Sequence, residues 1–269
     1  CGKRAIDYFA DKFDDPMMYA QAVKSVSVPT QSILFNIDIE GPLTKDKTAV
    51  LRVFAKMFYN HCGFYGDDLK IAKLERFIEK QGKTQQFREA FEKVNGAPWT
   101  ETRDSFAFFE DDIVSVLQST LGMSEQAARN WFNGEETNEL SIAQLVADIQ
   151  EYVDGKGKDF RLLFMVDEVG QYIGDDGDLM INLQSLVEEI GIRCHGKVWV
   201  MVTSQEAIDS VVHITGNDFS KIQGRFNTRL SLSSSSVDEV IKKRVLAKTD
   251  AADQLLRMVY DKEHAVLKN

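Results

Sequence analysis

The sequence predicts an α/β fold in which a long, all-helical segment interrupts a parallel sheet. Two uninterrupted apolar runs, 162–166 and 198–202, have the length and composition of strands that are buried on both faces of a sheet. Segment 179–190, between them, repeats its apolar residues at helical spacing. Strand, helix and strand in that order form a βαβ unit, whose crossover is expected to be right-handed.

The chain divides into three parts. Residues 1–44 contain a short helix and an expected strand over 33–39, and residues 158–269 return to strand–helix alternation. Residues 45–157 between them are almost entirely helical in pattern, with an apolar stripe over 50–58 and another over 142–153 that Ser141 and Gln144 open as a capping box. We expect an insertion into the α/β core, or alternatively a helical domain packed beside it.

Asp167 and Glu168 follow the first apolar run directly, at the carboxyl edge of the expected sheet. Ligands of open α/β sheets bind at that edge. A buried strand that ends in Asp-Glu is the Walker B arrangement of P-loop ATPases, in which the Asp helps to hold Mg²⁺ and the Glu orients the attacking water. The alternative is a strand that ends in a solvated acidic turn.

Two later segments favour the ATPase interpretation. Thr203 ends the second apolar run, where AAA+ ATPases carry a polar sensor residue, and Gln205 could assist it. A Gly-Arg-Phe segment then precedes a short strand over 230–232, which is where AAA+ proteins place an arginine finger. Arg225 is the first candidate for this finger and Arg229 the second. As alternatives, Thr203 would simply terminate a strand and Arg225 would pair with a surface carboxylate.

At this point the chain resembles a particular family, the large P-loop ATPases of BREX bacteriophage-exclusion systems (BrxC and the related PglY). The resemblance rests on FMVDEVGQYIGDD at 164–176, VTSQE at 202–206 and DFSKIQGRF at 218–226, and it extends upstream through 2–9, 33–38 and 109–114. It therefore covers nearly the whole chain. Members of this family are several times longer, which implies that this chain is an internal fragment ending at the start of a lid.

The resemblance implies a P-loop NTPase (AAA+-like) core that binds ATP and Mg²⁺. It also implies a homo-oligomer that acts with other BREX proteins and with DNA. The chain departs from the family in one respect, because it lacks the Gly-x-x-x-x-Gly-Lys-Ser/Thr loop whose backbone N–H groups cradle the phosphates. We expect that Walker A loop upstream of Cys1, so the chain alone should bind nucleotide weakly and be inactive.

Composition limits the other function classes. The net charge is −10, from 42 acidic against 32 basic side chains, and this excludes a broadly basic DNA-binding surface. No apolar run approaches the roughly 18 residues of a membrane span, so we expect no membrane association. Cys1, Cys62 and Cys194 are too few and too scattered for a disulfide framework, which indicates a reducing, cytoplasmic environment.

Two rival functions stay open. One is an ATPase-fold module, like the signalling STAND proteins, that binds partners or DNA without hydrolysing ATP. The intact pair of Asp167 and Glu168 argues against it, because a non-hydrolysing module does not need the Glu. The other is a metal-dependent nuclease that uses Asp38 together with that pair. We rank it last, because no Lys stands in the usual sequence relation to these carboxylates.

Overall fold

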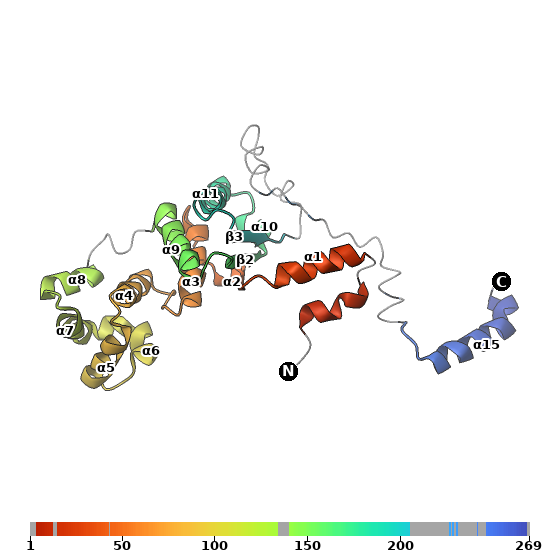
Figure 1. The fold of residues 1–269 in the computed structure, drawn as a ribbon, viewed down its shortest axis with the longest axis horizontal. Coiled ribbons are helices and arrows are strands. Elements are labelled where there is room, and N and C mark those ends of the chain that lie inside the picture. The colour runs from red at the N-terminus through yellow and green to blue at the C-terminus, as the bar shows by residue number, and fades with distance from the viewer. Residues whose placement is uncertain are drawn as a thin grey trace. The chain divides into compact units, whose positions relative to one another are not determined.

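A computed structural model describes residues 4–12, 15–42, 44–133, 140–204, 226, 228, 230, 241 and 246–267. The chain separates into two compact units, Cys1–Arg225 and Phe226–Asn269. The described elements of the first unit are η1 (Ala5–Tyr8), η2 (Ala10–Lys12), α1 (Pro16–Val26), β1 (Thr30–Asn36), α2 (Ile37–Glu40), α3 (Ala49–His61), α4 (Leu69–Lys80), α5 (Thr84–Asn95), α6 (Trp99–Thr102), η3 (Arg103–Phe108), α7 (Glu110–Leu121), α8 (Glu125–Asn133), α9 (Ile142–Gly155), β2 (Arg161–Asp167), α10 (Val169–Ile173), α11 (Gly177–Arg193) and β3 (Val198–Val202) (Figure 1).

The described strands form one parallel sheet in the order β1–β2–β3. Asn36 at the end of β1 lies beside Asp167 at the end of β2, and Val166 lies beside Val202 at the end of β3. All three strands therefore end at one edge. Together with the helices, this sheet confirms the predicted α/β class and the two apolar runs as strands.

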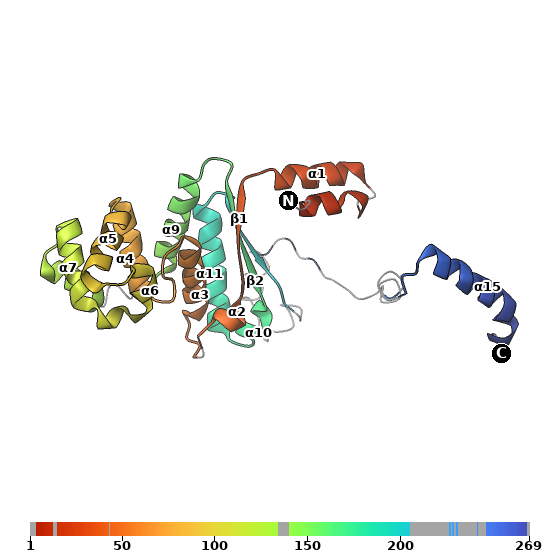
Figure 2. The same ribbon diagram turned by 90° about the horizontal axis from the view of Figure 1, so that it is seen from below.

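Three helices, α3, α9 and α11, cover one face of the sheet (Figure 2). Phe54 of α3 packs between Phe35 of β1 and Phe164 of β2, with ring centroids 5.5 Å and 5.3 Å apart. Most strand residues that point to this side are buried: Ile33, Phe35, Leu162, Phe164, Val166 and Val198. The hydrophobic core of the α/β part therefore lies between this face and the three helices.

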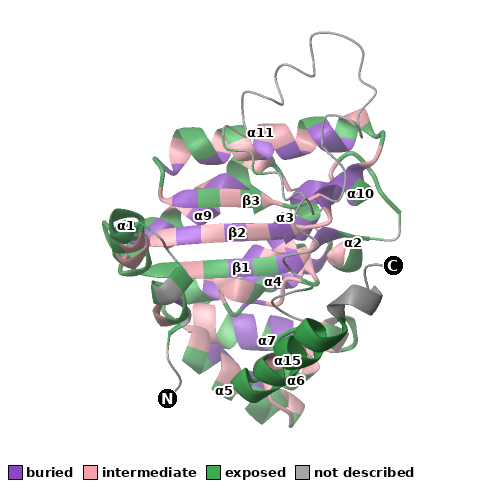
Figure 3. Ribbon diagram, turned by 90° about the vertical axis from the view of Figure 1, so that its right-hand side faces the viewer, coloured by how far each residue is buried: buried purple, intermediate pink, exposed green. Residues whose placement is uncertain are grey.

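The opposite face is open in the described part of the chain. Leu34 is 69% exposed and Trp199 is 60% exposed, and Leu163 and Met165 between them are half-buried. Figure 3 shows the strands from this side, with the ribbon coloured by burial. The expectation that the strands are buried on both faces is therefore met on one face only. The order of the strands explains the open face. The crossovers from β1 to β2 and from β2 to β3 run in the same direction across the sheet. Right-handed connections that run in one direction lie on the same face, so both place their helices on one side.

The helices α4 to α8 surround a second core, rich in aromatic residues. Trp99 contacts Phe87 and Phe91 edge-on, with ring centroids 5.2 Å and 5.0 Å away, and all three rings are buried. The helix predicted over 142–153 is α9. Ser141 accepts the N–H of Gln144 as predicted, but the Gln144 side chain donates to Asp148 and does not return to Ser141.

The end of β1 differs from the prediction. The strand was expected to reach Ile39, but it stops at Asn36, and α2 begins at Ile37. The Asn36 side chain accepts the N–H groups of Asp38 and Ile39, at 2.9 Å and 3.2 Å, and so caps the new helix. An Asn at the N-cap explains why an apolar segment that continues the strand pattern turns into a helix.

In the second unit, the described helix α15 (Asp250–Leu267) is preceded by Thr249, whose hydroxyl accepts the N–H of Ala252 at 3.3 Å. Across the described residues of both units, no helix combines the length and the apolar character that crossing a bilayer requires.

Candidate functional site

The carboxyl edge of the sheet brings together the acidic pair and the predicted sensor. Asp167 is the last residue of β2, Glu168 follows it, and Thr203 follows the last residue of β3. The hydroxyl of Thr203 donates to Oδ1 of Asp167 and accepts the backbone N–H of Glu168, with an N–O distance of 3.3 Å. Three residues that the sequence predicted as one site are therefore joined directly.

Backbone hydrogen bonds fix this group on both sides of the turn. The N–H of Thr203 donates to the carbonyl of Val166 at 2.9 Å, and the N–H of Val169 donates to the carbonyl of Thr203 at 3.1 Å. The sheet ladder thus continues one residue past β3 and meets the first residue of α10. The position of Thr203 is consequently set by main-chain contacts and does not depend on its own side chain.

Glu168 has a left-handed backbone, with φ 62° and ψ 28°. This conformation costs a non-glycine residue on the order of 1–2 kcal/mol, and such strained positions cluster at functional sites. The residue forms the N-cap of α10 without a capping side-chain bond, and its Oε2 is shielded from solvent. A glycine would relieve the backbone strain, so a carboxylate at this position is a costly choice that favours a chemical role.

A wall beside the acidic pair is built from α2, α10 and the loop that follows α2. Lys45 donates to the carbonyl oxygen of Tyr172 at 2.8 Å, and its ammonium lies 4.1 Å from the centroid of the Tyr172 ring. The same ammonium is 3.9 Å from Oδ1 of Asp38. Burial raises the pKa of Tyr172, so its hydroxyl stays protonated.

Sequence reasoning missed this wall. Lys45 stands in a polar loop, and Tyr172 has no motif of its own. Gly41 also belongs to the wall, since a Cβ there would come within 2.6 Å of Cε2 of Tyr172. The wall bears on the nuclease alternative, which was ranked last because no Lys stands in the usual sequence relation to the carboxylates. In the structure Lys45 does lie near Asp38. In the described chain, however, no hydrogen bond links Asp38 to Asp167.

The donor set at this edge fits a magnesium ion that is bound mainly by its nucleotide. Mg²⁺ typically takes only one or two carboxylates from a protein, together with waters and phosphate oxygens. Asp167 offers such a carboxylate, since Thr203 engages Oδ1 and no described residue hydrogen bonds Oδ2. Among the described residues, no three His, Cys, Asp or Glu side chains converge as an all-protein metal cage would require.

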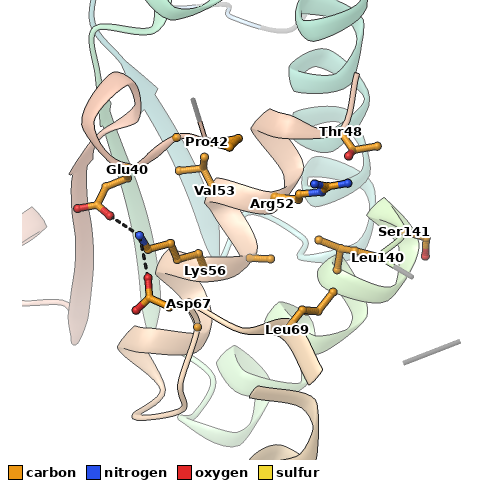
Figure 4. A pocket seen from close by; sticks show the side chains of 13 residues that line it. Glu40, Pro42, Thr48, Arg52, Val53, Lys56, Asp67, Leu69, Leu140 and Ser141 are labelled. Atoms are coloured by element: carbon orange, nitrogen blue, oxygen red, sulfur yellow. Dashed lines mark ion pairs between the residues drawn. The ribbon is translucent and has the colours of Figure 1, made fainter. Parts of the chain in front are cut away.

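A cavity of about 910 Å³ lies elsewhere, between α3, the loop after α2 and the beginnings of α4 and α9 (Figure 4). Its lysine, Lys56, is paired with Glu40 at 2.8 Å and with Asp67 at 2.9 Å. Its arginine, Arg52, pairs with Asp46 at 3.0 Å. Both cations are therefore neutralised, and the cavity is a poor phosphate site despite its size.

Three of the predicted site residues, Gln205, Arg225 and Arg229, lie outside the described residues. Comparison with known proteins adds no further constraint on the site, because no family model and no solved structure matches the chain.

Proposed function

We propose that this chain is part of an AAA+-type P-loop ATPase of a bacteriophage-defence (BREX) system. The observation that carries the proposal is the hydrogen-bonded group of Asp167, Glu168 and Thr203 at the carboxyl edge of three parallel strands. In this proposal Asp167 helps to hold Mg²⁺, and Glu168 orients the water that attacks the γ-phosphate. Bound ATP and Mg²⁺ would supply the phosphoryl group and the charge that neutralises its oxygens.

The topology of the sheet supports an ATPase core with a further strand upstream of Cys1. Consider a right-handed connection that leads from an upstream strand into β1. It crosses the open face only if the upstream strand lies on the β3 side of the sheet. A Walker A strand beside the edge of β3 that no described strand occupies would meet this condition, and the helices before β1 would then cross the open face. The same strand would bring its phosphate loop next to Asp167 and Thr203.

The remaining parts of the proposal rest on the sequence resemblance. Arg225, or Arg229 as the second choice, would act as an arginine finger towards a neighbouring subunit of a homo-oligomer. Other BREX proteins and DNA are the proposed partners. Because the net charge is −10, contact with DNA would need a local basic patch or another part of a longer protein.

Substitution of each acid in the longer protein tests the proposal. Glu168→Gln keeps the size and hydrogen bonding of the side chain but removes the charge that positions water, so we expect ATP to bind and persist unhydrolysed. Asp167→Asn should weaken Mg²⁺-dependent binding of ATP. The matched control is Glu125→Gln, which removes an exposed acid on α8 and should leave turnover unchanged.

Turnover at the wild-type rate in Glu168→Gln would reject the catalytic role. If the longer protein with its natural sequence bound ATP tightly but did not hydrolyse it, the non-hydrolysing, STAND-like module would be the better interpretation. Isothermal titration of ATP·Mg²⁺ separates binding from hydrolysis in each variant.

A further inference from the structure

The hydroxyl of Thr203 is already committed to the two acidic residues. A hydroxyl carries one proton to donate and two lone pairs to accept. In this chain the proton goes to Oδ1 of Asp167, and a lone pair accepts the N–H of Glu168. One small side chain therefore joins the carboxylate of the first acid to the backbone of the second.

We propose that Thr203 is a positioning residue, which holds Asp167 and the left-handed backbone of Glu168 in one arrangement and does not itself sense the phosphate. The kinetic consequences of this inference rest on the proposed function. Its structural part rests on the hydrogen bonds alone. A proton that is donated to Asp167 is not available to a phosphate oxygen, so the sensor role predicted from the sequence conflicts with the observed bonding.

The surroundings explain why this residue can impose order on the pair. The main chain holds Thr203 from both sides, at the carbonyl of Val166 and at the N–H of Val169. Its hydroxyl thus extends from a rigid point at the end of the sheet. A hydrogen bond to a carboxylate is stronger than one between neutral groups, so the contact with Asp167 also fixes the rotation of the hydroxyl.

The backbone of Glu168 depends on this contact more strongly than the backbone of a residue in a favourable conformation would. Left-handed backbone is unfavourable for a non-glycine residue, and it persists only when the surrounding structure enforces it. The bond from the N–H of Glu168 to Thr203 is one such constraint, located at the strained residue itself. Losing the hydroxyl should therefore release the backbone of Glu168 and disorder its carboxylate.

Hydrogen exchange in the 269-residue chain tests the structural part without any nucleotide. Thr203→Val keeps the β-branched shape and removes the hydroxyl, and we expect the Glu168 amide to exchange about tenfold faster in NMR experiments. Thr203→Ser restores the hydroxyl and should return the rate to within about threefold of wild type. Thr120→Val is the matched control, because the Thr120 hydroxyl donates only to a carbonyl within α7.

Kinetics in the longer protein test the catalytic part. A positioning residue predicts that Thr203→Val lowers kcat about 100-fold, while the ratio of ATP to ADP affinity stays within about threefold of wild type. Thr203→Ser should recover most of kcat. A sensor of the γ-phosphate predicts instead that the affinity ratio falls towards one.

Each outcome decides the inference. Unchanged exchange at Glu168 in Thr203→Val would overturn it, and so would a collapse of the ATP to ADP ratio. If exchange accelerates as expected but Glu168→Gln hydrolyses ATP normally, the positioning role stands and the catalytic role proposed for Glu168 fails. If exchange accelerates but the longer protein neither binds nor hydrolyses ATP, the positioning role stands and the ATPase proposal fails. A Thr203→Val chain that is too unstable to measure leaves Thr203→Ser as the deciding variant, because fast Glu168 exchange with the hydroxyl present would contradict the role.

Discussion

Two pairs of acidic residues in this chain have opposite surroundings. Glu75 and Asp148 are buried among the helices, at 7% and 5% exposure. Glu75 accepts from Tyr65, Trp99 and Arg103, and Asp148 accepts from Tyr59, Gln144 and Arg76; these contacts measure 2.5–3.1 Å. Asp167 and Glu168 instead lie at the sheet edge, and Asp167 has the hydroxyl of Thr203 as its partner among the described residues.

The comparison of the two pairs separates acids that stabilise the fold from acids that are candidates for binding or catalysis. Each buried carboxylate is surrounded by donors that it neutralises or satisfies, as a buried charge requires. Burial and the neighbouring Asp148 raise the pKa of Tyr59, so that hydroxyl remains a donor. At the edge, Asp167 accepts from the hydroxyl of Thr203 and no described residue hydrogen bonds its Oδ2, while Glu168 has a strained, left-handed backbone. An open carboxylate oxygen on Asp167 and a strained backbone at Glu168 therefore mark the edge as the site where these acids could act on a ligand.

The largest expected effect is on the buried side of this comparison. Glu75→Ala leaves the indole N–H of Trp99 without its acceptor inside the helical core. It also removes the carboxylate that pairs with Arg103, whose guanidinium keeps the carbonyl of Gly63 at 3.4 Å. Removing one partner of a buried ion pair costs roughly 3–5 kcal/mol of the free energy of unfolding. Urea denaturation of the 269-residue chain measures it.

Asp167→Ala in the same chain is the counterpart, and it should cost less than about 1 kcal/mol because Asp167 is only half-buried and has no cationic partner among the described residues. Glu75→Gln is the control that keeps an acceptor oxygen for Trp99, and it should lose much less than Glu75→Ala. Equal losses for the two alanine variants would remove the distinction between the pairs.

Sequence reasoning located the edge pair but neither buried acid, and the reason is physical. A strand that ends in Asp-Glu is a local pattern, and the parallel register carries it next to the end of the following strand. Glu75 and Asp148 look like ordinary polar positions on amphipathic helices. Apart from Gln144, which lies four positions before Asp148, their partners come from residues 10–89 positions away, and no short-range pattern specifies such contacts.

The same limit explains the features of the sheet that the sequence missed. Periodicity predicted β2, β3 and α11 because their apolar residues are consecutive or helically spaced. It did not predict the open face, because Leu163 and Met165 are apolar whether or not a helix covers them. It also carried β1 too far, since the capping side chain of Asn36 outweighs the strand preference of Ile37 and Ile39.

A second prediction tests whether the sheet edge is as tightly packed as the helical core, although its two acids are only half-buried. In Gly41→Ala the new Cβ would lie 2.6 Å from Cε2 of Tyr172 and 2.7 Å from the carbonyl oxygen of Ile37. The backbone oxygen has little freedom to move, so we expect a loss of about 1–3 kcal/mol in thermal unfolding. The double variant Gly41→Ala, Tyr172→Leu relieves only the side-chain contact and should recover part of the loss. A neutral Gly41→Ala would show that the wall is loose.

A third prediction concerns a substitution that should stabilise the chain instead of destabilising it. Glu168→Gly removes the penalty of a left-handed non-glycine residue, and it should stabilise the chain by about 0.5–1 kcal/mol after the extra backbone entropy of glycine in the unfolded state. The same change should abolish hydrolysis in the longer protein. Glu168→Ala is the matched control, since it removes the carboxylate but keeps the strain. Destabilisation by Glu168→Gly relative to Glu168→Ala would mean that the left-handed backbone is not strained.

The smallest expected effect lies at the opposite edge of the sheet, where His61 hydrogen bonds to Gln31 near the start of β1, with Nε2 and Oε1 3.0 Å apart. Burial, with a smaller contribution from Lys156, lowers the pKa of His61 below its usual 6.5. The folded state therefore binds this proton more weakly than the unfolded state does. Stability from this group is present above pH 6.5 and is lost as the pH falls through the lowered pKa.

His61→Gln should remove this acid-dependent loss, so the difference in urea midpoint between pH 7.5 and pH 5.5 should shrink. The change should be small because the imidazole is only partly buried and solvent screens its charge. Lys156→Gln removes one of the two causes and should shrink the difference less. An unchanged difference in His61→Gln would mean that carboxylates, and not His61, cause the loss of stability in acid.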